Sequence, residues 1–434
     1  AAGHPSPSFP LAMAYLPSVV TMELNGFAVD PATVEVVATE QEMHIELITR
    51  GIQHLAKACR DGFLERWALG KVGAKEDPKV QQKMAATFDA AGVNLNSPAQ
   101  VLALLHATGL SVEATDEGTL KAYSEHPVAS RIQELRGWAK LHGTYSEEYR
   151  RLLRHPDSDG AIHAQYSVCG AETTRMRCAH PNVQNVPPTM RCVFVSRFPG
   201  GKLLYSDLSG LEYRVIGHMS QDARLLALFR EGKDIHVDAA SRAYRIRPDA
   251  VTKEQRRIAK TLNYAGVYGA GPDTVFGVVG KEDWPLYRQT QNLYPGVNRW
   301  KEQIIHGLLH DGVVKNCFGQ WWKFPPMATQ AIEREAVNRI IQSAGHCVLV
   351  VYVLEVLRWF EAAVSDGQLS ALPLWAHECH DSFIFDVKAC DAVEADRIVR
   401  CVAGDLNALI QEAFDEEMTV PMTAEVKLLD AWKE

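Results

Sequence analysis

Two aspartates that end apolar segments, far apart in the chain, constrain the fold of this sequence most. Asp207 ends the expected strand Lys202–Asp207, and Asp381 lies between the arms of an expected hairpin, Leu372–Cys379 and Ser382–Val387. A carboxylate at the end of a buried strand is costly unless it is paired or binds a cation. On adjacent strands, the two carboxylates could together hold two Mg²⁺ ions, as phosphoryl transfer requires. Either aspartate alone is better explained as a residue that caps a helix or closes a turn.

A second constraint is a helix expected between Thr252 and Gly269. Thr252 and Gln255 form a capping-box pattern, and Gly269 suits the helix end. Steps of four place two cations and then two aromatic rings on one face, at Arg256, Lys260, Tyr264 and Tyr268. Cations suit a polyphosphate and rings suit a base and its sugar, so the stripe matches a nucleoside triphosphate. The alternative is a solvated basic face that grades into core aromatics.

The composition is that of a globular protein with two or three domains. Its 434 residues are 47% hydrophobic and 23% charged, and the net charge of -8 argues against a protein that coats nucleic acid by bulk charge. Nine cysteines without a CxxC pair indicate reduced thiols and an intracellular location, the cytoplasm of a bacterium or phage host, or an organelle. Four residues could be imagined as a zinc site, but their spacing matches no compact zinc module: His163, Cys169, Cys178 and His180.

The pattern along the chain predicts alternating helical and mixed regions. Residues 31–155 and 250–345 are expected to be mostly helical, and the second hairpin arm, with Phe383 and Phe385 alternating with Ser382 and Ile384, reads as a half-buried strand. The apolar run Cys347–Leu354 is too short to span a membrane and indicates a buried helix. Cys59–Lys83 is charged and weakly periodic, which suggests a surface insertion, either passive or a docking site for a partner protein.

These segments resemble the polymerase region of family A DNA polymerases, and they occur in the order of that family. Asp207–Arg214 is similar to its motif A, Arg256–Gly269 to motif B and His380-Asp381 to the core of motif C. Further similar segments are Asn94–Pro98, Arg136–Tyr145, Thr173–Pro187, Glu231–His236 and the set Arg334, Asn338 and Gln342. The resemblance implies an α+β right-hand fold, with an antiparallel-sheet palm and helical fingers and thumb. It places a lead segment and thumb at 1–160, palm at 161–224 and 343–434, and fingers at 225–342.

The resemblance also implies roles for individual residues in template-directed DNA synthesis. Asp207, Asp381 and the Leu208 carbonyl would bind two Mg²⁺ ions, for which Mn²⁺ could substitute, and Lys260 would assist catalysis. Residues that would bind the deoxynucleotide, the first three as cationic donors to its triphosphate, are Arg256, Lys260, His236, Tyr264, Tyr268 and Glu212. Residues that would contact primer-template DNA are Arg136, Lys140, Arg175, Gln184, Asn185, Arg334, Asn338, Gln342 and His380. For Arg136 and Lys140 a solvated face is an equal alternative.

The sequence departs from the family pattern at three positions that bear on the site. Ser382 follows Asp381 where most members have Glu, which removes a carboxylate near the metals. Ala265 follows Tyr264 where Gly is usual, with Gly266 one place later, so the helix would be slightly stiffer there. Tyr rather than Phe at 264 implies weak discrimination against dideoxynucleotides.

Two other functions are compatible with parts of this pattern. A single-subunit RNA polymerase shares the palm plan, but Glu212 would occupy the space of a ribose 2′-hydroxyl. A nucleic-acid-binding scaffold would not need both metal ligands. We therefore expect a DNA polymerase that acts as a monomer on primer-template DNA and deoxynucleotides, with a processivity or replisome partner possible, no membrane, and no proofreading domain in this chain.

Overall fold

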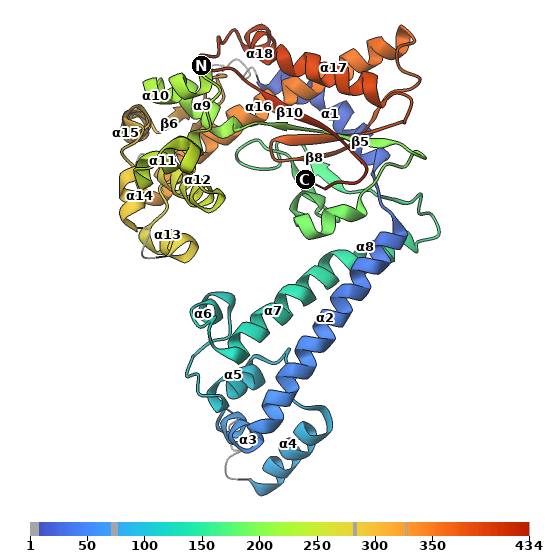
Figure 1. Cartoon of the computed structure of the whole chain (residues 1–434), viewed down its shortest axis with the longest axis vertical. Coiled ribbons are helices and arrows are strands. Elements are labelled where there is room, and N and C mark those ends of the chain that lie inside the picture. The colour runs from blue at the N-terminus through green and yellow to red at the C-terminus, as the bar shows by residue number, and fades with distance from the viewer. Residues whose placement is uncertain (1–7, 71–76, 281–283, 326, 328, 434) are drawn as a thin grey trace. The chain divides into compact units, whose positions relative to one another are not determined.

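The computed structural model describes residues 8–70, 77–280, 284–325, 327 and 329–433, which form two compact units (Figure 1). The larger unit contains the chain up to Val29 and from Ala161 onward, and the smaller unit contains Asp30–Gly160. The first 29 residues therefore belong with the larger unit, although they precede the smaller one in the chain.

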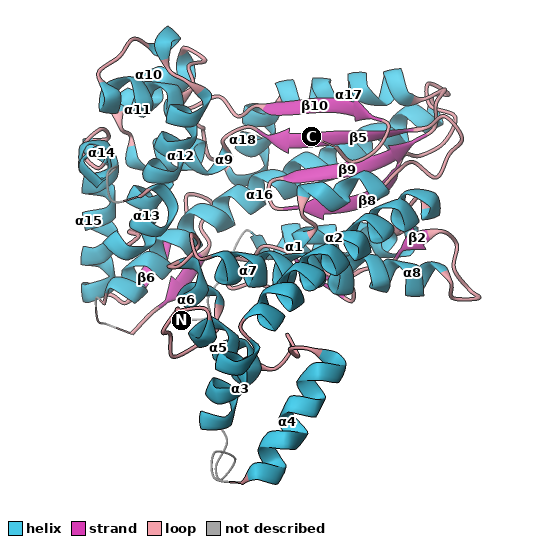
Figure 2. Ribbon diagram, turned by 60° about the horizontal axis from the view of Figure 1, so that its bottom comes forward, coloured by secondary structure: helices cyan, strands magenta, loops and turns pink. Residues whose placement is uncertain are grey.

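A four-stranded antiparallel sheet organises the larger unit. Its strand order is β10-β5-β9-β8, and Figure 2 shows the four strands side by side. The strands are β5 (Lys202–Leu208), β8 (Leu374–Cys379), β9 (Ser382–Val387) and β10 (Ala424–Leu429). The hairpin expected near residues 370–390 is confirmed, and its second arm pairs with the strand that ends at Asp207. The predicted α+β class with an antiparallel sheet is confirmed as well.

The expectation of a half-buried second arm is wrong, because all six residues of β9 are buried. Phe383 and Phe385 pack into the main hydrophobic core on one face. On the other face, Asp386 accepts one hydrogen bond from the Ser196 hydroxyl and another, 2.9 Å long, from the Arg197 backbone N–H. The loop that carries Ser196 and Arg197 therefore covers this face of β9. Burial of Asp386 is tolerated there because its carboxylate is hydrogen-bonded.

Helices surround this sheet and make up the rest of the larger unit. The main core includes helices α1 (Ser8–Asn25), α16 (Gln330–Ser365) and α17 (Ala392–Gly404). The remaining helices are α9 (Leu211–Ser220), α10 (Ala223–Arg230), α11 (Ile235–Tyr244), α12 (Lys253–Tyr268), α13 (Pro272–Val279), α14 (Trp284–Thr290), α15 (Pro295–His310) and α18 (Leu406–Phe414). Three two-stranded sheets complete the larger unit. They pair β1 (Phe27–Ala28) with β2 (Ala161–Ile162), β3 (Gln165–Ser167) with β4 (Arg177–Ala179), and β6 (Val313–Lys315) with β7 (Trp321–Lys323).

The apolar run Cys347–Leu354 lies within the 36-residue helix α16, which by length and composition alone could cross a membrane. Most of its apolar window, 78%, is buried inside the protein. The core of a folded domain accounts for such a helix, as the sequence predicted for this run.

The smaller unit is helical, as expected for residues 31–155. Its helices are α2 (Pro31–Ala58), α3 (Arg60–Leu69), α4 (Pro78–Ala91), α5 (Pro98–Ala107), α6 (Glu117–Lys121), α7 (Pro127–Leu141) and α8 (Glu147–Leu153). In the described part of Cys59–Lys83, Phe63 and Trp67 are buried in this unit's core, with Phe63 against Phe88, so α3 does not lie wholly on the surface; the insertion itself stays a prediction. The two aromatic residues are one helical turn apart, so α3 has a buried face that its many charges obscured. Residues 71–76 of that segment lie outside the described residues.

Candidate active site

The sheet register brings the two aspartates to the same end of adjacent strands. Asp207 of β5 is opposite Ser382 of β9, and the Leu208 N–H donates to the Asp381 carbonyl at 3.0 Å. His380 has a φ of 56°, a left-handed conformation that lets two residues close the hairpin. The Ser382 hydroxyl donates to the Cys379 carbonyl at 2.8 Å across this turn. Asp381 is thus presented by a tight turn beside the end of β5.

The helix expected at Thr252–Gly269 is confirmed, and its polar stripe faces a cavity. Thr252 and Gln255 form both bonds of the capping box, and Gly269 ends α12 in the left-handed conformation with φ 66°. Arg256, Lys260 and Tyr264 line a cavity of about 460 Å³ together with both aspartates. Tyr264 is half-buried, lines this cavity and, like Tyr268, packs against the main core, so the alternative of a basic face that grades into core aromatics also fits these contacts.

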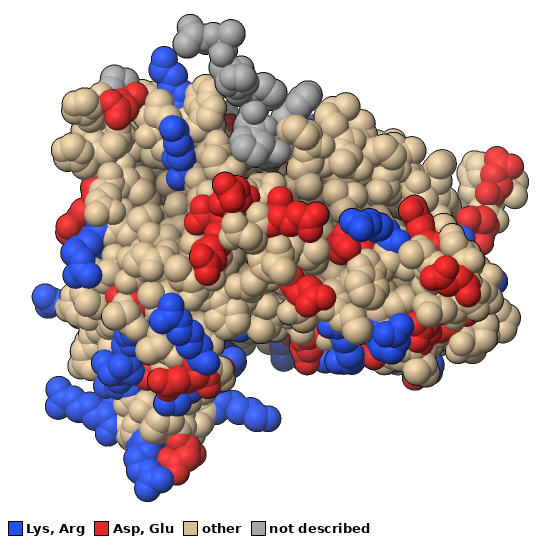
Figure 3. Space-filling view, turned by 90° about the horizontal axis from the view of Figure 1, so that it is seen from above, with Lys and Arg blue, Asp and Glu red and all other residues tan. Residues whose placement is uncertain are grey.

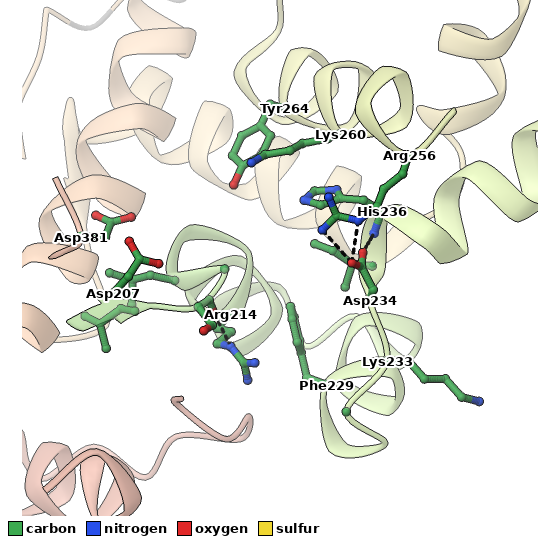
Figure 4. A pocket seen from close by; sticks show the side chains of 16 residues that line it. Asp207, Arg214, Phe229, Lys233, Asp234, His236, Arg256, Lys260, Tyr264 and Asp381 are labelled. Carbon is green, nitrogen blue, oxygen red and sulfur yellow. Dashed lines mark hydrogen bonds and ion pairs between the residues drawn. The ribbon is translucent and has the colours of Figure 1, made fainter. Parts of the chain in front are cut away.

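Figure 4 shows the arrangement of these side chains around the cavity. Asp207 and Asp381 lie next to each other on one side, Arg256 and His236 lie on the other, and Lys260 lies with Tyr264 along a third. The complete lining is Asp207, Leu208, Ser209, Gly210, Leu211, Arg214, Phe229, Gly232, Lys233, Asp234, Ile235, His236, Arg256, Lys260, Tyr264 and Asp381. Carboxylates therefore face cations across one space.

Arg175 bridges two of the acidic groups beside the cavity. Its Nη2 donates to Asp381 Oδ1 at 2.8 Å and to Glu212 Oε1 at 3.1 Å. Glu212 accepts a further hydrogen bond from the Tyr268 hydroxyl at 2.6 Å. Burial raises the pKa of Asp381 to about 6, the charges of Glu212 and Asp207 add to this effect, and Arg175 opposes it. The site therefore concentrates negative charge that one guanidinium only partly neutralises.

The cationic side is held by a carboxylate that the sequence reasoning missed. Asp234 caps the N-terminus of α11 through the N–H groups of His236 and Val237, and it pairs with the Arg256 guanidinium at 2.7 Å. Its position at a helix start in Glu231–His236 was the available signal. Lys260 is exposed in the cavity and has no ion-pair partner within the described parts of the chain.

His236 is not the cationic donor that the resemblance implied. Burial lowers its pKa to about 4, and the charges of Arg256 and Lys260 lower it further against the opposing Asp234, so the ring is neutral at pH 7. The Asn263 amide nitrogen is 3.3 Å from Nδ1. The role of Nδ1 in this bond depends on which ring nitrogen carries the proton, and in either case the neutral ring has one N–H donor and one acceptor nitrogen.

Tyr264 is oriented by neighbouring rings. It packs edge-on against Tyr213 at a centroid distance of 5.2 Å and lies nearly parallel to Tyr268 at 6.3 Å. Burial raises the pKa of the Tyr264 phenol, and the nearby carboxylate charges raise it further, so its hydroxyl stays protonated and can donate a hydrogen bond.

Two further cations in the cavity lining were missed by the sequence reasoning. Arg214 donates from Nε to the Ser209 carbonyl at 2.7 Å and lies over the Phe229 ring at 4.9 Å. It therefore fixes the turn that follows β5. Lys233 pairs with Glu231 at 2.6 Å, and Figure 4 shows its side chain directed away from the aspartates. Neither residue belongs to α12, so the four-residue periodicity of that helix could not reveal them.

The residues expected to contact primer-template DNA lie outside this cavity lining. Gln184 donates to the Glu378 carbonyl at 3.1 Å, next to the strand end that carries His380. Asn185 and His380 are exposed in the larger unit. On α16, Arg334 is exposed and Asn338 and Gln342 are half-buried. Their roles stay predictions.

Arg136 and Lys140 belong to α7 of the smaller unit. The Arg136 guanidinium donates to the carbonyl and hydroxyl of Thr115, the latter at 3.3 Å, whereas Lys140 is exposed. Arg136 thus already has partners within its own unit.

The cysteine-histidine set considered as a zinc site is not assembled. Cys178 is buried and donates to the Pro181 carbonyl at 3.5 Å, and Cys169 is exposed. Within the described ranges, three potential metal-ligating side chains gather only at Glu42, His142 and Glu147. Arg150 lies 2.6 and 2.8 Å from the two glutamates there, so this cluster is already neutralised.

Charge on the face of the protein that Figure 3 shows is mixed. On the face in Figure 3, basic and acidic side chains both occur and no single sign covers it, in keeping with the net charge of -8. Any binding of an anionic ligand must therefore depend on local groups such as those of the cavity.

Comparisons with known proteins identify the family. The model of DNA polymerase family A matches residues 68–434, and the chain belongs to this family. The curated relatives include DNA polymerase I of Streptococcus pneumoniae, 27% identical over 402 residues, which cover 86% of this chain and 44% of that protein. DNA polymerase I of Chloroflexus aurantiacus is 29% identical over 357 residues, covering 79% of this chain and 36% of that protein.

A solved structure confirms the expected right-hand polymerase fold. The polymerase domain of Pol1 from M. smegmatis, in complex with DNA primer-template and dNTP, is similar with a TM-score of 0.75 over 97% of this chain and 70% of that chain, at 24% identity. The chain spans less than half the length of the curated relatives named above.

Proposed function

We propose that this chain is a DNA-directed DNA polymerase that adds deoxynucleotides to a primer 3′ end. The observation that carries the proposal is the cavity itself. Asp207 and Asp381, presented by adjacent strands, face Arg256, Lys260 and Tyr264 across about 460 Å³. Membership in DNA polymerase family A supports the same activity.

The donor set suits two Mg²⁺ ions. Carboxylate oxygens of Asp207 and Asp381 and the Leu208 carbonyl are hard ligands from one strand end, and few protein ligands leave room for water and phosphate oxygens. Such a pair of ions would activate the attacking 3′ oxygen and stabilise the leaving oxygen.

The opposite side would hold and orient the nucleotide. Arg256 and Lys260 would offset the charge that develops on the transferred phosphoryl group, while His236 donates as a neutral imidazole. Because Arg256 is paired with Asp234, a triphosphate would have to compete with that carboxylate or share the guanidinium. Tyr264 would stack near the base and sugar and Lys260 would lie closest to the leaving phosphates.

The sugar gate favours deoxynucleotides over ribonucleotides. The Tyr268–Glu212 hydrogen bond of 2.6 Å and the Glu212–Arg175 pair fix the carboxylate next to Tyr264. A fixed, already bonded carboxylate would exclude a ribose 2′-hydroxyl. This contact disfavours the RNA polymerase alternative.

Extension of a labelled primer on a DNA template with four deoxynucleotides and Mg²⁺ tests the proposal. Wild type should extend to the template end, and both Asp207→Ala and chelation of Mg²⁺ should abolish extension. Asp430→Ala, an exposed aspartate at the other end of the sheet, serves as the matched control and should leave extension unchanged. The same gel also shows whether the labelled primer is shortened by 3′→5′ degradation, and the sequence predicts that it is not.

Primer-template binding without extension by wild type would instead support the scaffold alternative. Equal extension with ribonucleotides would support the RNA polymerase alternative.

A further inference from the structure

A half-buried lysine on α15 contacts the backbone of α12, the helix that carries the polar stripe. Lys301 Nζ donates to the Gly266 carbonyl of α12 at 3.0 Å. Burial lowers the pKa of Lys301, with Glu333 opposing. Within the part of the chain that the structure describes, Lys301 forms no ion pair, so this carbonyl is its polar partner. A half-buried ammonium needs a polar partner for the water it has lost, and a carbonyl with extra negative character is a strong one.

The Gly266 carbonyl has this character because it lies in the last turn of α12. The N–H groups of Gly269 and Ala270 both bond to the Ala265 carbonyl, the latter at 2.8 Å. The next carbonyl, that of Gly266, points out of the helix end and accepts from Lys301 instead. Carbonyls of the last turn need external donors, and a cation there also interacts favourably with the helix dipole.

Gly266 itself permits a close approach from the neighbouring helices. A Cβ at this position would lie 2.2 Å from the Gln291 amide nitrogen, so the Gln291 side chain lies directly on the α12 backbone. Asn298 of α15 donates to the Gln291 carbonyl at 2.9 Å. This packing gives a physical account of why Gly occurs at 266 while Ala occupies 265.

The contact lies between the two aromatic rings of the polar stripe. Gly266 is two residues from both Tyr264, which lines the cavity, and Tyr268, which bonds Glu212. We propose that Lys301 is a positioning residue, which through the Gly266 carbonyl holds the last turn of α12 and thereby the two tyrosines that contact the nucleotide. Lys301 touches neither the cavity nor the reacting groups, and the inference rests on the proposed function for its nucleotide.

Replacing Lys301 with methionine removes the ammonium and keeps an unbranched apolar side chain of similar length. We expect the KM for deoxynucleotides to rise about tenfold while kcat changes less than about threefold, because a loosened turn weakens nucleotide contacts. Ribonucleotide incorporation relative to deoxynucleotide should rise, since Tyr268 no longer holds Glu212 as firmly. Lys301→Arg keeps a donor and should restore most of the sugar selectivity.

Two measurements separate this role from general stability and from the proposed function. Hydrogen exchange of the amides at 264–270 should accelerate in Lys301→Met and not in Lys202→Met, a half-buried lysine that pairs with Asp430 at the far end of β5. Affinity for a fluorescent deoxynucleoside triphosphate, measured without primer, should fall in the same variant. Both readouts remain informative if no primer is extended.

Unchanged exchange and unchanged nucleotide affinity in Lys301→Met would overturn the inference. So would an equal loss in Lys301→Arg accompanied by a lower melting temperature, because that result would mean that Lys301 only supports the fold. Failure of wild type to extend primers, with exchange and affinity behaving as expected, would refute the proposed function alone.

Discussion

Replacing Glu378 with glutamine should make the protein more stable at neutral and alkaline pH. Glu378 is on β8, is 2% exposed, and accepts a hydrogen bond from the Tyr15 hydroxyl of α1. Burial raises the pKa of Glu378 to about 8 from 4.5; the Tyr15 bond lowers it and the Asp381 charge raises it. The folded protein therefore keeps this carboxyl protonated at pH 7, where the unfolded chain ionises it.

Proton linkage gives the sign and the size of the change that Glu378 causes in the free energy of unfolding as pH rises. A group whose folded pKa is raised contributes stability that is complete below its unfolded pKa and is lost as pH rises through its folded pKa. Here the loss begins near pH 4.5 and ends near pH 8. At about 1.4 kcal/mol per pH unit, wild type loses about 3 kcal/mol by pH 7 from this group. Glutamine keeps the shape and an acceptor for Tyr15, and it cannot ionise.

Urea unfolding of wild type and Glu378→Gln at a series of pH values measures this difference. The stability of the variant relative to wild type should grow by about 3 kcal/mol between pH 4.5 and pH 7 and level off above pH 8. The contributions of the other titrating groups to the pH dependence of unfolding largely cancel in this difference, because both proteins carry those groups. Glu425→Gln, at an exposed position, controls for the loss of one acidic residue. A difference that is constant with pH would refute the reasoning, since it would mean that Glu378 ionises in the fold as easily as in the unfolded chain.

Three further predictions concern the cavity. Tyr264→Phe should increase discrimination against dideoxynucleotides, because the Tyr264 hydroxyl can replace the contact that a nucleotide without a 3′-OH loses. Equal selectivity of wild type and variant, in competition between dideoxynucleotides and deoxynucleotides, would contradict this. Ser382→Glu should alter the extension rate less than about tenfold, because Ser382 bonds the Cys379 carbonyl and the aspartate pair remains; a larger change would make the position directly catalytic. In an NMR titration His236 should titrate near pH 4, and a bound triphosphate should raise that value; an unperturbed titration near 6.5 would refute its burial.

Much of the local structure at the site could be predicted from sequence. The α12 helix was predictable because its cap, its end and its four-residue stripe are signals within one helix. The β8–β9 hairpin was predictable because two apolar arms flank a short polar turn. Such features are encoded by residues that are neighbours in the chain.

The pairings that tune the site could not be predicted in this way. Arg175 reaches Asp381 across 206 positions, and Tyr15 reaches Glu378 across 363. No periodicity or motif spacing links residues so far apart, because their contact is created by the tertiary fold. The neutral state of His236 was missed for the same reason, since burial and not residue type decides its charge.

Incorrect expectations about exposure arose from reading charge as solvent contact. In α3, charged residues outnumber the two buried aromatics, yet Phe63 and Trp67 decide how the helix packs. In β9, Asp386 suggested a solvent-facing side, yet a loop hydroxyl and a backbone N–H satisfy its carboxylate. Burial of a polar group depends on partners from other segments, which a single strand or helix does not reveal.

The absence of a carboxylate at Ser382 does not disturb how the two aspartates are placed. Their relative position is fixed by backbone contacts: the Asp207–Ser382 register, the Leu208 N–H on the Asp381 carbonyl, and the left-handed residue His380 in the turn. The Ser382 hydroxyl adds a bond across that turn at 2.8 Å. A glutamate there would lose this bond and add a third acidic side chain near Asp381, whose pKa is already raised. The relative position of Asp207 and Asp381 is therefore a property of the sheet, and the residue after Asp381 can vary without moving either aspartate.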